Sequence, residues 1–123
     1  MPEILLVDDE PNIQKLLKAS LAARGHQVLV ASNGEEALEL ARLECPDLVL
    51  LDLKIPRLSG WDVLTGLKAD EKLRQAAVII MTGAANPSDE DKARSMGAVG
   101  CLAKPFTPDE LMCEVNLALG KPD

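Results

Sequence analysis

Basic clusters, long apolar segments and a leader-like start are all lacking in this sequence of 123 residues. Its lysines and arginines occur singly, and the net charge is −7. A nucleic-acid surface needs basic side chains gathered along the phosphates, so this composition argues against direct nucleic-acid binding. No apolar run approaches the roughly 20 residues that cross a bilayer, and residues 1–3 lack the basic start of a signal peptide. We therefore expect a cytoplasmic protein without membrane insertion.

Cysteine and aromatic residues are also scarce. Cys45, Cys101 and Cys113 are an odd number of cysteines without metal-ligand spacing, which predicts reduced thiols packed as small hydrophobes. Trp61 and Phe106 are the only aromatic residues. We expect Trp61 to pack at the start of a helix. For Phe106 two interpretations stay open, local packing against the last helix or docking of a partner protein.

Hydrophobic residues make up 47% of the chain and gather in short runs that alternate with segments of helical period. Such runs are typical of buried parallel strands. Strands that alternate with helices predict an α/β fold, a single doubly wound (βα)5 domain whose five-stranded parallel sheet is covered on both faces. The predicted strands are 4–7, 27–31, 48–51, 78–81 and 99–103.

Turn and capping residues mark where the helices between these strands should begin. The first helix is predicted over 11–24, ends at Gly25, and should bury an apolar stripe of Ile13, Leu16, Leu17 and Leu21. His26, just after it, is expected at the surface or in a turn. The fourth helix is so polar that we expect a weak hold on the core. The other predicted helix starts are Ser32 with Glu35 as a capping box, Ser59-Gly60, Asn86-Pro87, and Thr107 with Glu110 as a capping box.

Polar residues directly follow four of the predicted strands: Asp8 and Asp9, Asp52, Thr82 and Lys104. The carboxyl ends of strands line the ligand crevice in an open α/β sheet, so these side chains should converge. Carboxylates suit magnesium, which prefers oxygen ligands. Asp52 could then attack phosphorus as a nucleophile, while Lys104 and Thr82 answer the charge of the phosphoryl oxygens.

This ordered set resembles the receiver domain of two-component response regulators, over nearly the whole chain. The spacing is that of the family, with 30 residues from Asp52 to Thr82 and 22 from Thr82 to Lys104. The matching motifs are the acidic pair 8–9, the segment 52–60, Thr82-Gly83 and Lys104-Pro105.

The resemblance implies a flavodoxin-like strand order of 2-1-3-4-5. It also implies that Asp52 is the phosphoacceptor, which takes a phosphoryl group from a phosphohistidine on a histidine kinase or histidine phosphotransfer protein. Asp9, Asp52 and the Lys54 carbonyl would ligate Mg²⁺ (or Mn²⁺), with Asp8 acting through water. Thr82 and Lys104 would bind the phosphoryl group and switch the surface of the fourth helix, fifth strand and fifth helix toward a downstream protein target.

By the same resemblance the protein is regulatory rather than an enzyme, and catalyses only its own aspartyl phosphorylation and dephosphorylation. It would be a monomer or weak dimer. The receiver domain is expected to occupy residues 1–123 with no effector domain, whether as a stand-alone protein or as a piece of a longer regulator.

Three positions bear on how this chain would differ from the family pattern. Cys101 stands where the family has a Tyr or Phe that couples to the threonine, so we expect coupling through an aromatic ring to be lost. Lys54 and Ala84 lie at positions that tune the lifetime of the phosphoryl group. Pro105 is expected to fix the loop after Lys104, where a cis bond is possible.

Other functions remain as alternatives. A haloacid-dehalogenase type phosphatase would need a second acid two residues after Asp52, where Lys54 stands. A flavodoxin-like electron carrier would need amides and hydroxyls for the flavin phosphate, where residues 8–10 are acidic. A phosphate-independent protein-interaction module with the receiver fold is the alternative that Cys101 leaves open.

Overall fold

The computed structural model describes residues 2–55, 59–83 and 87–120. Its five strands form one parallel sheet in the order β2-β1-β3-β4-β5, as predicted. The predicted flavodoxin-like fold is therefore confirmed. The strands are β1 (Glu3–Val7), β2 (Gln27–Ala31), β3 (Leu48–Asp52), β4 (Ala77–Thr82) and β5 (Gly100–Ala103).

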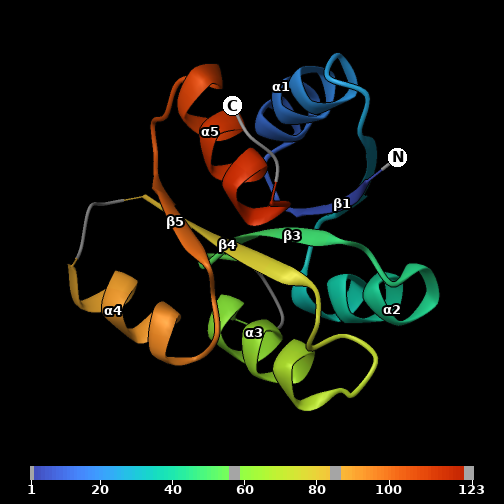
Figure 1. Ribbon diagram of the computed structural model, residues 1–123, viewed down its shortest axis with the longest axis vertical. Helices are drawn as coiled ribbons and strands as arrows, with labels where there is room; N and C mark the ends of the chain where they lie inside the picture. Colours follow the sequence, from blue (N-terminus) through green and yellow to red (C-terminus); the bar gives the residue numbers. More distant parts are fainter. Residues whose placement is uncertain (1, 56–58, 84–86, 121–123) are drawn as a thin grey trace.

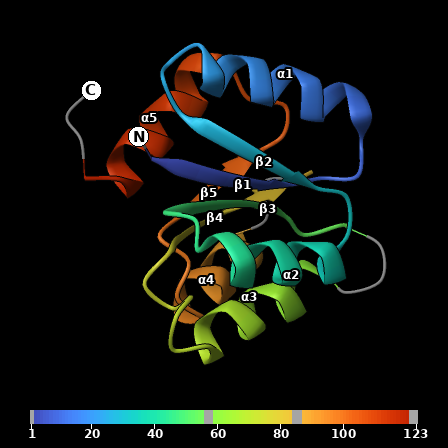
Figure 2. The same cartoon turned by 90° about the vertical axis from the view of Figure 1, so that its right-hand side faces the viewer.

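Helices cover both faces of the sheet. Helices α1 and α5 lie on one face, and α2, α3 and α4 lie on the other (Figures 1 and 2). Because successive strand residues point to opposite faces, Leu5 and Val7 join the α2–α3–α4 layer while Ile4 and Leu6 join the α1–α5 layer. The helices are α1 (Pro11–Ala22), α2 (Gly34–Glu44), α3 (Gly60–Ala69), α4 (Pro87–Ser95) and α5 (Pro108–Ala118).

The order of the strands places the crevice. Strand β1 pairs with β2 on one side and with β3 on the other. The chain therefore leaves the sheet in opposite directions after β1 and after β3, and a cleft opens at the carboxyl ends of these two strands. Whatever follows β1 and β3 in the sequence is placed at this cleft.

The predicted helix starts that lie within the described residues agree with the structure except at α2, and Asn86, expected before α4, lies outside those residues. Thr107 and Glu110 form the predicted capping box of α5, and Ser59 caps α3. Helix α2, however, is capped by Asn33, which accepts a hydrogen bond from the backbone of Glu36 at 2.9 Å. The predicted box of Ser32 and Glu35 is thus wrong by one residue. Helix α1 ends at Ala22, two residues earlier than predicted, before the positive φ of 88° at Gly25.

Two predictions about side chains are wrong: Leu16 is not in the core, and Cys45 and Cys113 are exposed instead of packed as small hydrophobes. His26 lies at the end of the turn after α1, as expected, where its amide donates to the Leu21 carbonyl at 3.2 Å, but its side chain is buried. Leu16 is 58% exposed although it belongs to the apolar stripe of α1. Leu17 and Leu21 are buried as predicted and Ile13 is half-buried.

Helix α4 has the weak hold on the core that its sequence predicts. Among its described side chains only Ala93 is buried. No helix of the described chain is both long and apolar enough to pass through a membrane.

Candidate functional site

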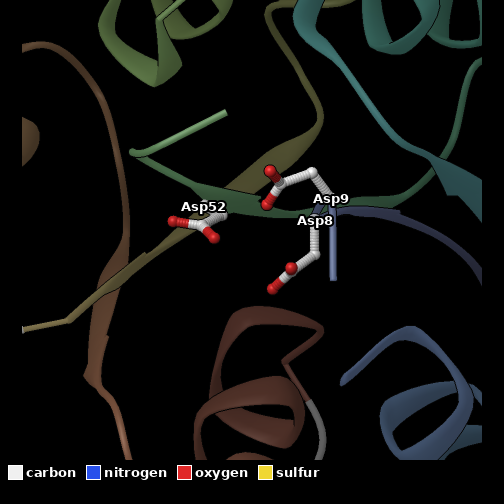
Figure 3. A group of neighbouring side chains, drawn as sticks. All are labelled: Asp8, Asp9 and Asp52. Atoms are coloured by element: carbon white, nitrogen blue, oxygen red, sulfur yellow. The ribbon is translucent and has the colours of Figure 1, made fainter. Parts of the chain in front are cut away.

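Three carboxylates meet at the carboxyl ends of β1 and β3. Asp8 and Asp9 follow β1, and Asp52 is the last residue of β3. One carboxylate oxygen from each lies within 4.8 Å of the others. Figure 3 shows the side chains of the neighbours Asp8 and Asp9 leaving the chain in different directions, with Asp52 beside them. Asp8 and Asp52 are buried, whereas Asp9 is exposed. The sequence thus predicted this cluster correctly.

The Asp8 carboxylate is held from two sides. One oxygen accepts from the Glu10 backbone at 2.9 Å and the other accepts from Lys104 Nζ at 2.8 Å. The Asp8 backbone is fixed as well, since its amide donates to Ala31 O at 3.1 Å and its carbonyl accepts from the Gln14 side chain. This places a buried negative charge at a defined position.

The Asp52 carboxylate has a similar arrangement. One oxygen accepts from the Lys54 backbone at 3.0 Å and the other accepts from Lys104 Nζ at 3.0 Å. The loop after Asp52 is closed by a hydrogen bond from the Gly60 amide to Leu53 O at 3.1 Å. A carboxylate has about four acceptor sites, so Asp52 keeps lone pairs for a cation or a phosphorus atom.

Lys104 joins the two carboxylates from the end of β5. Its backbone amide donates to Thr82 O at 2.7 Å, which ties it to the end of β4. Burial by itself lowers the pKa of the Lys104 ammonium, but its hydrogen bonds and charge interactions with Asp8 and Asp52 outweigh burial and raise the pKa. Lys104 therefore carries its positive charge at neutral pH. The Lys104–Pro105 bond is cis, the isomer that the sequence left open.

Thr82 completes the group at this edge of the sheet. It is the last residue of β4 and is buried. Its neighbour Met81 is the register partner of Asp52. The ends of β1, β3, β4 and β5 thus carry Asp8, Asp52, Thr82 and Lys104 side by side, as the sequence predicts.

The donor set fits a hard divalent cation. Mg²⁺ is bound in proteins by one or two carboxylates together with waters and phosphate oxygens. The exposed carboxylate of Asp9 and the free lone pairs of Asp52 offer such ligands, within 4.8 Å of each other and of Asp8. Lys54 is exposed and its amide is used by Asp52. Its carbonyl as a further ligand remains a prediction.

Cys101 and Phe106 are two further predicted positions that the structure describes. Cys101 is half-buried and packs against the apolar layer under α4. Burial, with Glu90 in support and Arg94 in opposition, raises the pKa of the Cys101 thiol. Phe106 is half-buried against the α1–α5 layer. Ala84, predicted to tune the phosphoryl lifetime, lies outside the described residues.

An apolar groove of about 340 Å³ opens beside Lys104. Helix α1 forms one wall and the loop after β5 with the start of α5 forms the other. The sequence did not predict this groove. The apolar residue Leu16 on α1 is the sequence feature that could have indicated it. Its apolar lining includes Ile13, Leu16, Leu17, Pro105 and Phe106.

Comparison with known proteins decides the family. The response regulator receiver domain matches residues 4–116. The chain belongs to this family. Receiver domains are regulatory units of two-component systems, and this chain is one of them.

Relatives of known function agree. The chain is 40% identical over 119 residues to the transcriptional regulatory protein KdpE of Mycobacterium tuberculosis, covering 97% of this chain and 51% of that protein. The chain thus spans about half the length of the first relatives that it matches. It is also 35% identical to the polar-differentiation response regulator DivK of Brucella anthropi, with 98% of both chains covered.

Solved structures have the same fold. A putative response regulator from Chloroflexus aurantiacus superposes with a TM-score of 0.92 at 28% identity, covering 98% of both chains. The receiver domain of sensor histidine kinase PA1611 from Pseudomonas aeruginosa superposes with a TM-score of 0.89 at 31% identity, also over 98% of both chains. That structure has a magnesium ion coordinated in its active site cleft.

Proposed function

We propose that this receiver domain is a phosphorylation-dependent switch in which Asp52 accepts a phosphoryl group from a phosphohistidine. One observation carries the proposal: a single ammonium, Lys104 Nζ, lies 2.8 Å from Asp8 and 3.0 Å from Asp52 at the cleft of the sheet. Structural ion pairs do not need a third carboxylate beside them, whereas a phosphoryl site needs both a cation site and a lysine.

In the transfer step an oxygen of Asp52 forms a new bond to phosphorus. The bond between phosphorus and the donor imidazole nitrogen breaks, and its electron pair stays on that nitrogen. Lys104 is close enough to bind first the Asp52 carboxylate and then the phosphoryl oxygens, as the negative charge shifts to them. In this proposal Thr82, at the end of the neighbouring strand β4, donates its hydroxyl to another phosphoryl oxygen.

A divalent cation fits beside Asp52 and supplies positive charge against the phosphoryl oxygens when it is bound. Asp9 and Asp52 are the direct ligands in our proposal, together with the Lys54 carbonyl, and Asp8 acts through water. Asp8 is the one carboxylate of the three that is completely buried. This supports an indirect role for Asp8.

The apolar groove is where the protein that carries the phosphohistidine would dock. A donor imidazole must reach Asp52, so its protein has to cover the cleft. The groove lies beside Lys104, and in it Leu16 is 58% exposed while the apolar side chains of Ile13 and Phe106 are half-buried. An amphipathic helix of a histidine kinase or phosphotransfer protein fits such a surface.

The chemistry is tested by intact mass. The chain is incubated with acetyl phosphate, with and without Mg²⁺, beside an Asp52→Asn variant. We expect a magnesium-dependent gain of one phosphoryl group that is absent from the variant. No gain under any condition would reject the proposal in favour of a phosphate-independent interaction module.

The docking role of the groove has its own test. Leu16→Glu should slow phosphotransfer from a phosphotransfer protein that labels the wild-type chain, because it puts a charge in an apolar contact. Labelling by acetyl phosphate should be unchanged. Leu43→Glu is the matched control, since Leu43 is 79% exposed on α2, in the opposite layer. Equal transfer to both variants would place the docking surface elsewhere.

A further inference from the structure

The only tryptophan of the chain contacts helix α4 through a charged side chain. Lys92 Nζ of α4 lies 4.4 Å from the centroid of the Trp61 ring of α3. Helices α3 and α4 are neighbours in the same layer (Figures 1 and 2). An ammonium at this distance over an indole face is attracted by the ring quadrupole. We call this pair the Trp61–Lys92 contact.

The tryptophan end of the contact is fixed to the phosphoacceptor. Trp61 follows Gly60, whose amide donates to Leu53 O at 3.1 Å. A Cβ atom built on Gly60 would lie 2.6 Å from Leu53 Cα and 2.9 Å from Asp52 O, so the start of α3 rests directly on the backbone of Asp52 and Leu53. The Trp61 ring packs against the apolar layer under α3 and α4. Trp61 therefore keeps its position relative to the phosphoacceptor.

The lysine end of the contact is on the least firmly held helix. Ala93 is the one buried side chain among those described in α4. Arg94 adds hydrogen bonds of 3.3 Å to Glu90 within the helix and to Val99 O. Because so few described side chains hold α4, one additional contact affects its position. Helix α4 is the next described element after β4, whose last residue is Thr82.

Position 101 cannot supply an aromatic connection. Cys101 packs against the same apolar layer as Trp61, but its thiol is too small to transmit movement between the site and α4. In this chain the Trp61 ring is the aromatic group that contacts α4.

We propose that the Trp61–Lys92 contact holds α4 in its unphosphorylated position and is released when Asp52 is phosphorylated. It takes the place of the aromatic coupling that Cys101 cannot provide. The inference rests on the proposed phosphorylation of Asp52. Phosphorylation draws Thr82 toward the phosphoryl group and moves α4 with it, while Gly60 keeps Trp61 in place. The two ends then separate, and the surface of α4, β5 and α5 changes toward its partner.

The contact can be followed by fluorescence. The chain has one Trp and no Tyr, so its intrinsic fluorescence emission comes from Trp61. Emission is recorded with Mg²⁺, before and after acetyl phosphate, while intact mass measures phosphorylation in the same samples. We expect a change of emission in the wild type. Lys92→Met keeps the apolar stem but removes the charge, and should lose this change. Lys92→Arg should keep it, because a guanidinium also binds an aromatic face.

Lys72→Met is the matched control, since Lys72 is exposed in the loop after α3 and is replaced by the same residue. It should behave as the wild type.

Amide exchange in α4 before phosphorylation is the second measurement. Lys92→Met should accelerate it by about two- to fivefold over Lys72→Met, the effect of losing one exposed cation–π contact.

The outcomes separate the two proposals. No mass gain in the wild type rejects phosphorylation, and the release of the contact with it. A mass gain without a change of emission rejects the release alone. A phosphorylated Lys92→Met variant that keeps the full change of emission, or that exchanges in α4 like Lys72→Met, also overturns the role of the contact.

Discussion

Position 60 has no room for a side chain beside the phosphoacceptor. A Cβ there would lie 2.6 Å from Leu53 Cα and 2.9 Å from Asp52 O, and these two neighbours are backbone atoms that cannot turn away. We expect Gly60→Ala to lower the free energy of unfolding by about 1–3 kcal/mol, because α3 must move off the loop. Urea unfolding followed by circular dichroism measures this loss.

Gly83→Ala is the control for this substitution. A Cβ at Gly83 meets no atom within 4 Å, and its φ is not in the left-handed region. The free energy of unfolding of Gly83→Ala should be unchanged, or higher by about 0.4–1 kcal/mol because alanine restricts the unfolded chain. Equal stability of the two variants would mean that the close approach at Gly60 carries no energy.

The three cysteines should differ in reactivity. Cys45 and Cys113 are exposed, whereas Cys101 is half-buried and its pKa is raised by burial, with Glu90 in support. The thiolate is the reactive form, so a raised pKa leaves Cys101 largely protonated at pH 7–8. We expect Cys101 to be alkylated last, and to lag still at a pH where an ordinary thiol is half ionised. Peptide mass spectrometry at a series of pH values measures the order. Alkylation of Cys101 at the rate of Cys113 would contradict this prediction.

At the scale of elements, the start of α2 shows how closely two caps can compete in one sequence. The Asn33 side chain accepts from the Glu36 amide at 2.9 Å, and the Glu36 carboxylate accepts from the Ser32 amide at 2.7 Å. The oxygen of Ser32 instead accepts from the Gln14 side chain. Both residues suit a cap and both have a glutamate three positions later, so the local pattern alone could not distinguish them.

This correction can be measured directly. Asn33→Ala should lower the free energy of unfolding by about 1 kcal/mol, the usual loss for a helix cap. Ser32→Ala should cost less, since only an exposed hydrogen bond to Gln14 is removed. Urea midpoints of the two variants give the comparison. A larger loss for Ser32→Ala would restore the cap that the sequence suggested.

Helix α4 was predictable as a weakly held element because composition alone limits burial. Asp89, Glu90 and Asp91 give it a polar surface, and Ala93 is the residue that the core receives. The sequence could not show which side chain connects α4 to its neighbour. That connection, Lys92 over Trp61, joins residues on two separate helices, and no local pattern encodes it.

At the scale of the whole molecule, the sheet brings together like charges that the fold must accommodate. Asp8, Asp9 and Asp52 lie together, and Lys104 is paired with Asp8 and Asp52, in a chain whose net charge is already −7. A ligand that binds the folded state and not the unfolded chain stabilises the fold by mass action. A divalent cation at this cluster should therefore stabilise the whole domain.

We expect the melting temperature to rise with Mg²⁺ concentration, and to return to its starting value when EDTA removes the metal. A concentration 100 times the dissociation constant would add roughly 2.7 kcal/mol. Asp9→Asn should weaken the effect, since Asp9 is the exposed carboxylate of the three. Asp91→Asn, on α4, is the control for loss of one charge. If Mg²⁺ raised the melting temperature of both variants by the same amount, it would only screen the net charge and would not bind at the carboxylate cluster.

The sequence by itself determined the order of the elements and the residues that end each strand. Hydrophobic period and turn chemistry are local, so they predicted the strands and helices of the described residues to within a few positions. The convergence of Asp8, Asp52, Thr82 and Lys104 also followed, because parallel strands necessarily share one edge for their carboxyl ends. The spacing of the motifs then indicated the family.

Only the tertiary structure decided how these residues are used. It buried Asp8 and exposed Asp9, it shared Lys104 between Asp8 and Asp52, and it left Leu16 in a groove. Lys104 is 96 residues from Asp8 in the chain, yet 2.8 Å away in space. Such contacts depend on how distant elements pack at the scale of a few ångströms, and sequence patterns, which act over one helix or strand, do not contain that information.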